Sequence, residues 1–143
     1  MENNIAHTAR GWIGTRFHHQ GRLKKSYNHS GGVDCLGLLI GVAKELNLPY
    51  SRYDENNYSH YPDTDRLRNR LASVMQEIDI NNILSGDILL LNIDGNPQHL
   101  AIAGEISGEL TMIHAYAPAR QVVEHLIDDL WRSRIVAIYR TWA

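Results

Sequence analysis

Residues 32–46 have the sequence GVDCLGLLIGVAKEL, in which apolar side chains recur at Cys35, Leu38, Leu39, Val42 and Leu46. This spacing of mostly three or four residues predicts a helix that buries one face. Asp34 stands directly before the helix as its N-cap, and Pro49 lies just beyond its end. We therefore expect the fold to be organised around a helix that begins at the only cysteine of the chain.

Other patterns on either side of this helix predict helices first and strands afterwards. Residues 5–13 are expected to form a short helix that ends at Gly14, residues 15–33 a loop, and residues 67–78 a second amphipathic helix. Strands are expected at residues 87–93, 99–105, 110–116 and 134–141, with turns at Asp94-Gly95 and Ser107-Gly108. This order predicts an α+β fold in which N-terminal helices pack on a C-terminal antiparallel sheet.

Length and composition predict one domain, residues 1–143, made in the cytosol without a signal peptide. Fourteen Lys and Arg residues against sixteen Asp and Glu residues argue against a nucleic-acid binder. No apolar run approaches the roughly 20 residues of a membrane span. One cysteine excludes an intramolecular disulfide.

Cys35 is a candidate nucleophile because it lies at the predicted start of a helix. The unpaired N–H groups and the positive end of the helix dipole favour an anion there, so we expect a thiolate at neutral pH. The alternative is a buried cysteine that packs as a small apolar side chain.

A nucleophilic cysteine needs a base and a group that orients the base, and His99 and His114 are the candidates. If Ser107-Gly108 is a two-residue turn, His99 lies opposite Tyr116, and both imidazoles lie on one face of the sheet. Ala101 and Ala103 on that face are small enough for the helix of Cys35 to approach. The alternative is that each histidine is a half-buried strand residue with a structural role.

No metal or cofactor is expected. His18, His19 and His29 could join Cys35, but their spacing matches no usual zinc pattern, and nucleotide-binding motifs are absent. The predicted loop carries four cations and no acid, namely Arg16, Arg22, Lys24 and Lys25. It is either a solvated surface or a border of the cleft that binds substrate carboxylates.

Four stretches resemble the NlpC/p60-type cysteine peptidases: GVDCLGL at residues 32–38, GDILL at 86–90, QHLAI at 98–102 and MIHAY at 112–116. Two further stretches, WIGT at residues 12–15 and WRSRIV at 131–136, are similar to those of small phage and prophage cell-wall peptidases. The resemblance spans nearly the whole chain.

The resemblance implies a circularly permuted papain-like fold that hydrolyses peptide bonds in bacterial peptidoglycan, commonly γ-D-glutamyl-diaminopimelate. It implies that Cys35 is the nucleophile, His99 the base and His114 the orienting residue, with backbone N–H groups at the helix start, beside Asp34 and Cys35, as the oxyanion hole. Many relatives have a tyrosine where this chain has Phe17, so Tyr27 is expected to supply the missing hydroxyl, or the site is weaker.

The resemblance therefore implies a phage or prophage peptidase whose partners are peptidoglycan and phage tail proteins and which reaches the wall in a phage-like particle. Phe17, Arg22, Lys24, Lys25 and Tyr27 are the expected substrate-binding residues. Two alternatives remain: a non-catalytic tail or assembly protein that keeps the fold, and an acyltransferase or thioesterase that uses the same residues.

Overall fold

The structure, a computed structural model, describes residues 4–53, 64–93 and 96–141. Its helices are α1 (Asn4–Arg10), α2 (Cys35–Glu45), α3 (Thr64–Val74) and α4 (Asp129–Ser133), with short 3-10 helices at Pro49–Tyr53 and Ala117–Ala119. Its strands are β1 (Arg22–Leu23), β2 (Gly32–Val33), β3 (Met75–Ile78), β4 (Ile88–Ile93), β5 (Asn96–Ile106), β6 (Glu109–Tyr116), β7 (Gln121–Leu126) and β8 (Ile135–Thr141).

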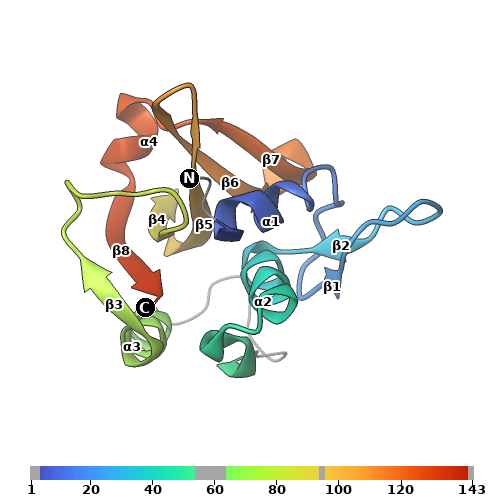
Figure 1. Ribbon diagram of the computed structural model, residues 1–143, viewed down its shortest axis with the longest axis horizontal. Helices are drawn as coiled ribbons and strands as arrows, with labels where there is room; N and C mark the ends of the chain where they lie inside the picture. Colours follow the sequence, from blue (N-terminus) through green and yellow to red (C-terminus); the bar gives the residue numbers. More distant parts are fainter. Residues whose placement is uncertain (1–3, 54–63, 94–95, 142–143) are drawn as a thin grey trace.

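Six strands form one sheet in the order β3-β8-β4-β5-β6-β7, and each neighbouring pair is antiparallel. Helices α1 and α2 lie against this sheet on one side (Figure 1). The predicted α+β class, with N-terminal helices packed on an antiparallel sheet, is confirmed. No helix in the described ranges is both long and apolar enough to cross a membrane.

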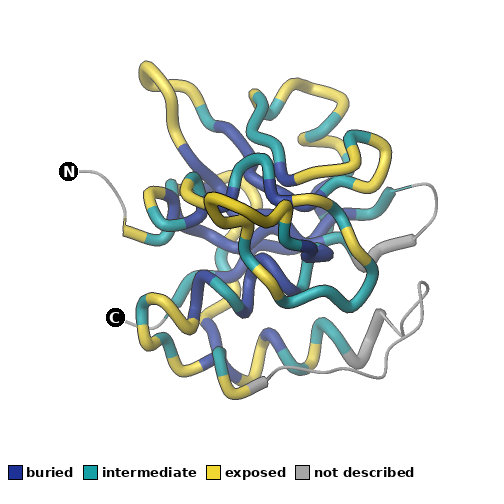
Figure 2. The backbone as a smooth tube through the Cα atoms, turned by 90° about the vertical axis from the view of Figure 1, so that its right-hand side faces the viewer, coloured by how far each residue is buried: buried dark blue, intermediate teal, exposed yellow. Residues whose placement is uncertain are grey.

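The two faces of the sheet bury separate apolar clusters. The first cluster joins α1 and α2 to the sheet and includes Leu38, Val42, Leu100, Ile102 and Ile113. The second cluster covers the opposite face and includes Leu89, Ala101, Ala103, Met112 and Ile135. Figure 2 shows these buried stretches gathered at the centre of the molecule, with exposed loops around them. The sheet is therefore covered on both sides.

Helix α2 begins where the sequence predicts, because Asp34 caps it. The Asp34 carboxylate accepts a hydrogen bond from the backbone N–H of Gly37 at 2.8 Å. Such a cap stabilises a protein by about 0.5–2 kcal/mol. Gly37 itself is needed because a Cβ there would collide with the carbonyl oxygen of Gly21, so α2 packs directly on the backbone before β1.

Residues 15–33 are a β-ribbon rather than the predicted loop. In strands β1 and β2, Arg22 pairs with Val33 and Leu23 pairs with Gly32. Nearer the tip of the ribbon, Ser26 and His29 form one further antiparallel pair. It projects from the body of the molecule beside α2 (Figure 1).

The second predicted helix ends earlier than expected. Helix α3 stops at Val74, and Met75–Ile78 forms β3, which pairs with β8. The buried Met75 lies opposite Thr141, so pairing with a strand at the far end of the chain overrides the helical pattern of residues 67–78. The predicted Asp94-Gly95 turn lies outside the described residues.

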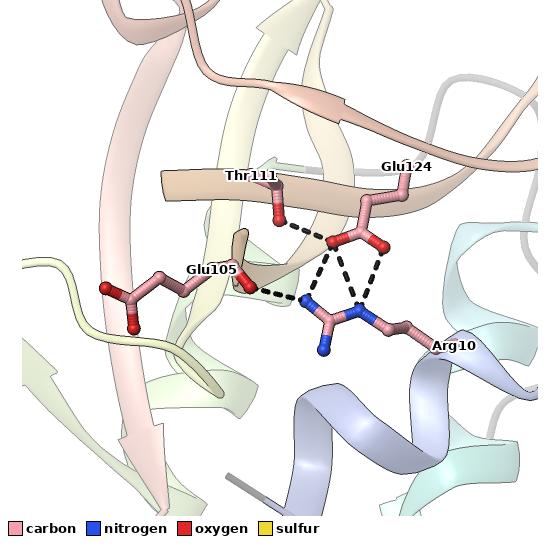
Figure 3. A network of polar contacts seen from close by, with 4 residues as sticks. All are labelled: Arg10, Glu105, Thr111 and Glu124. Carbon is pink, nitrogen blue, oxygen red and sulfur yellow. Dashed lines mark hydrogen bonds and ion pairs between the residues drawn. The ribbon is translucent and has the colours of Figure 1, made fainter. Parts of the chain in front are cut away.

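An ion pair fixes α1 to the edge of the sheet. The Arg10 guanidinium lies between the Glu124 carboxylate of β7 and the Glu105 carbonyl oxygen of β5 (Figure 3), with Nε 3.0 Å from Glu124 Oε1. The Thr111 hydroxyl donates a further hydrogen bond to Glu124 at 2.6 Å. Burial raises the pKa of Glu124, but the Arg10 and Thr111 hydrogen bonds and the Arg10 charge outweigh it and lower the pKa.

Candidate active site

Three imidazoles from three neighbouring strands form a continuous row of close contacts. His99 Nε2 lies 2.6 Å from His114 Nδ1, and His114 Nε2 lies 2.9 Å from His125 Nε2. The Nδ1 atom of His125 lies 2.9 Å from the Leu126 carbonyl oxygen. The row therefore runs from β5 across β6 to β7 and ends on the backbone.

The predicted turn explains why His99 and His114 meet. Ser107 and Gly108 both have positive φ, 53° and 81°, as in the two-residue turns that favour hairpins. The register follows from this turn: Ile106 pairs with Glu109, and Ile102 pairs with Ile113. The two imidazoles therefore share one face of the sheet, as predicted.

Cys35 lies on the helix side of the sheet, beside the residue that follows His99. The backbone of Leu100 in β5, two residues from the Ile102–Ile113 pair of β5 and β6, hydrogen-bonds to the Cys35 thiol. The expectation that α2 approaches over Ala101 and Ala103 is wrong, because those alanines pack in the second cluster. The thiol is instead next to the backbone of Leu100, which follows His99 in β5.

The charge state of the site differs from the expected thiolate. Burial, and next the negative charge of Asp34, raises the pKa of the Cys35 thiol to about 12, although the backbone hydrogen bonds lower it. Burial likewise lowers the pKa of His99 to about 4 and that of His114 to about 2, and repulsion from the other histidines acts in the same direction. The resting site therefore holds a neutral thiol and neutral imidazoles. The local effect of the helix terminus is outweighed by desolvation.

Asp34 acts as a structural anchor beside the cysteine. Besides Gly37, it accepts hydrogen bonds from the backbone N–H of Gln20 at 2.8 Å and from Arg22 Nη1 at 3.2 Å. Its carboxylate is only 7% exposed, so these donors replace water. The cap predicted from the sequence is confirmed, and it also fixes the ribbon to the start of α2.

Two of the cations expected to bind substrate form ion pairs with carboxylates of the protein itself. Arg22 pairs with Asp34, and Lys24 Nζ lies 3.0 Å from Glu45 Oε1 and 5.5 Å from the Trp12 ring. Arg22 and Lys24 thus help to hold the ribbon against α2, and their contact with substrate stays a prediction. Lys25 is exposed, and its backbone N–H donates to the Thr15 hydroxyl at 3.3 Å.

The two aromatic residues expected to bind substrate, Phe17 and Tyr27, differ in their exposure to solvent. Phe17 is half-buried against the first cluster, and its backbone N–H donates to the Arg120 carbonyl oxygen at 2.9 Å. Tyr27 lies at the tip of the ribbon, with its side chain fully exposed. The structure therefore does not bring the Tyr27 hydroxyl to Cys35, contrary to the expectation that it replaces the missing tyrosine at Phe17.

His18, His19 and His29 do not gather around Cys35. His29 Nδ1 accepts a hydrogen bond from Gly31 N–H at 2.7 Å, and His18 Nδ1 lies 2.9 Å from the His19 carbonyl oxygen. In the described part of the chain, no group of three or more His, Cys, Asp or Glu side chains is arranged to hold a metal ion.

Sequence reasoning missed the outer half of the site. His125 comes from β7, a strand that was not predicted, and the Trp131 ring of α4 packs on it at a centroid distance of 4.9 Å. Tyr116 stacks on His114 at 5.0 Å. The turn residues Ala117-Pro118 and the valines of β7 were the signal that could have indicated this strand.

Solved structures of similar fold come from bacteria and a eukaryotic parasite. NlpC1 from Trichomonas vaginalis has a TM-score of 0.62 and 20% identity over 97% of this chain and 43% of its own. An NlpC/P60 family protein from Bacillus cereus has a TM-score of 0.61 and 17% identity over 96% and 39%. The chain thus spans less than half the length of these two proteins.

An N-acetylmuramoyl-L-alanine amidase from Bacteroides uniformis matches over 95% of both chains, with a TM-score of 0.60 and 11% identity. None of the curated proteins matches the sequence. The sequence model of the NlpC/P60 family matches residues 14–140, which is most of the chain and includes Cys35 and the whole histidine row, so this chain belongs to the NlpC/P60 family.

Proposed function

We propose that this chain is a cysteine peptidase of the bacterial cell wall in which Cys35 is the nucleophile, His99 the base and His114 the residue that orients the base. The observation that carries the proposal is the contact of the Cys35 thiol with the Leu100 backbone, next to His99, at the capped start of α2. Membership of the NlpC/P60 family supports the same assignment.

The reaction begins from a neutral pair. Cys35 Sγ attacks the substrate carbonyl carbon while its proton passes to His99 Nδ1, the nitrogen that does not face His114. The C–N bond then breaks, and the His99 proton goes to the leaving amine, which leaves a thioester on Cys35. Water, deprotonated by the same nitrogen, hydrolyses the thioester and restores the thiol.

The backbone around Cys35 supports an oxyanion hole. The N–H groups at the first turn of α2 have no partner within the helix, and the backbones of Cys35 and Leu36 already hydrogen-bond towards the sulfur. Donors fixed in this way stabilise the negative oxygen that develops during acyl transfer. Phe17 offers no hydroxyl here, so the backbone donors carry this task.

The proposed substrate is the peptidoglycan stem peptide, with cleavage between D-glutamate and diaminopimelate. The stem carboxylates are anionic, and Lys25 on the ribbon is an exposed cation. We also propose that residues 1–143 act as one peptidase domain that reaches the wall in a phage-like particle. The likeness of residues 12–15 and 131–136 to phage peptidases supports this route.

Defined muropeptides, analysed by mass spectrometry after incubation with the protein, test the function and the bond together. A stem tripeptide should be split into two products whose masses place the cut between D-glutamate and diaminopimelate. Transfer of the acyl group to an added amine instead of water would indicate an acyltransferase. Intact tripeptide, tetrapeptide and amidated stems after long incubation would contradict the proposal and favour a non-catalytic tail protein.

A further inference from the structure

The histidine row has a direction, because it ends on a group that can only accept a hydrogen bond. A carbonyl oxygen has no proton to donate, so the His125 nitrogen that faces Leu126 O, Nδ1, carries the hydrogen. A neutral imidazole has one N–H donor and one acceptor nitrogen. His125 Nε2 is therefore the acceptor, and the bond from its neighbour must be donated to it.

The donor and acceptor nitrogens of the next two rings follow in turn, because each ring has one of each. His114 donates from Nε2 to His125, so His114 Nδ1 is an acceptor. His99 then donates from Nε2 to His114 Nδ1. The nitrogen left with a free lone pair is Nδ1 of His99, which is the one that must take the Cys35 proton.

The surroundings keep the rings in these positions. His114 is fully buried, and its ring is held between Tyr116 at 5.0 Å and Trp131 at 5.4 Å. His125 lies opposite Met112 in the sheet, one diagonal step from His114, and the Trp131 ring packs against it at a centroid distance of 4.9 Å. Rotation of the buried His114 ring would break two hydrogen bonds in a place with little water to replace them.

We propose that His125 is a positioning residue, which accepts the His114 hydrogen bond and thereby fixes the tautomers of both His114 and His99, so that Nδ1 of His99 remains the base. The expected effect of His125 on the rate of peptide hydrolysis rests on the proposed function. The tautomers themselves are a property of the resting protein and do not depend on any substrate.

Two variants separate the hydrogen bond from the packing. Replacing His125 by phenylalanine keeps a ring against Trp131 and removes the acceptor. Replacing it by glutamine places an amide oxygen near the position of Nε2, where it accepts from His114 again. The exposed His7 of α1, replaced by phenylalanine, is the matched control.

The direct readout is the tautomer of each histidine, measured by two-bond ¹H–¹⁵N correlation spectra at pH 8, where an imidazole ordinarily carries one proton. In the wild-type protein His99 and His114 should both be in the Nε2–H form and His125 in the Nδ1–H form. In His125→Phe the spectra of His99 and His114 should shift to a mixture of forms. His125→Gln and His7→Phe should keep the wild-type forms.

Kinetics give the second readout. His125→Phe should lower kcat by at least about ten-fold with KM nearly unchanged, since a wrong tautomer removes the base without removing substrate contacts. His125→Gln should recover most of the loss.

A wild-type His99 with its proton on Nδ1, or unchanged tautomers in a folded His125→Phe, would overturn the inference. If the phenylalanine variant does not fold, the wild-type spectrum alone decides. An inactive wild-type protein with the expected tautomers would refute the proposed function and leave this inference standing.

Discussion

His99 Nε2 and His114 Nδ1 lie 2.6 Å apart, just beyond the Ile102–Ile113 pair of their strands. The two imidazoles thus connect β5 to β6 through their side chains. On the helix side of the same place, the Leu100 backbone hydrogen-bonds to the Cys35 thiol. The proposed nucleophile and base are therefore linked through two consecutive residues of β5, His99 and Leu100.

The two histidines of the proposed triad should not be equivalent. His99→Gln should lose nearly all activity, because a base contributes about 10²–10⁴-fold to the rate. His114→Gln should retain more, since an amide can still accept the hydrogen bond from His99. Initial rates on a stem tripeptide, with circular dichroism to verify folding, measure this order. The reverse order would mean that the two roles are exchanged.

The raised pKa of Cys35 predicts slow alkylation at neutral pH. Only the thiolate reacts, and a folded pKa of about 12 lies above the usual value near 8.5, so the thiol stays protonated until the pH is high. The rate of iodoacetamide labelling should therefore keep rising from pH 6 to pH 9. Protein unfolded in urea should give a midpoint near 8.5. A plateau that is already reached at pH 6 in the folded protein would instead indicate a thiolate paired with His99.

Asp34 should matter more for stability than an ordinary helix cap. Asp34→Ala removes the partner of three donors in a buried place and should cost about 2–4 kcal/mol of unfolding free energy. The matched control is Asp128→Ala. It removes the exposed N-cap of α4, whose carboxylate accepts a hydrogen bond from Trp131 N–H, and should cost about 0.5–1 kcal/mol of unfolding free energy. Urea denaturation measures both, and equal losses would count against the anchoring role of Asp34.

The cations of the ribbon should divide into structural and substrate-binding ones. Arg22→Gln should lower the free energy of unfolding more than Lys24→Gln, because the Arg22–Asp34 pair is more buried than the Lys24–Glu45 pair. Lys25→Gln should leave stability unchanged and raise KM by up to about five-fold, less at high salt. An unchanged KM for Lys25→Gln at low salt would leave the ribbon with no role in binding.

The local features of the site follow from short stretches of sequence. The apolar spacing of residues 35–46 and the cap at Asp34 predict α2, and both are local effects. The two-residue turn at Ser107-Gly108 predicts that His99 and His114 share a face, because a strand alternates its side chains with a period of two.

The features that were missed depend on distant parts of the chain. Glu124 of β7 lies on the side of the sheet that faces the helices. A charged residue in the middle of a strand ordinarily indicates a solvent-exposed face, but here the Arg10 side chain of α1 forms an ion pair with Glu124. His125 was not predicted as a site residue because it lies on this strand. The prediction of a Cys35 thiolate was wrong for the same reason. Burial depends on the whole fold, and it raises the pKa of the thiol more than the helix terminus lowers it.

The role of Cys35 as the nucleophile is tested most directly by one comparison. Wild-type protein and Cys35→Ala, with matching circular dichroism spectra and unfolding transitions, are incubated with the same defined muropeptide, and the products are quantified by mass spectrometry. We expect cleavage by the wild-type protein and none by Cys35→Ala. Equal cleavage by the two proteins would contradict this role.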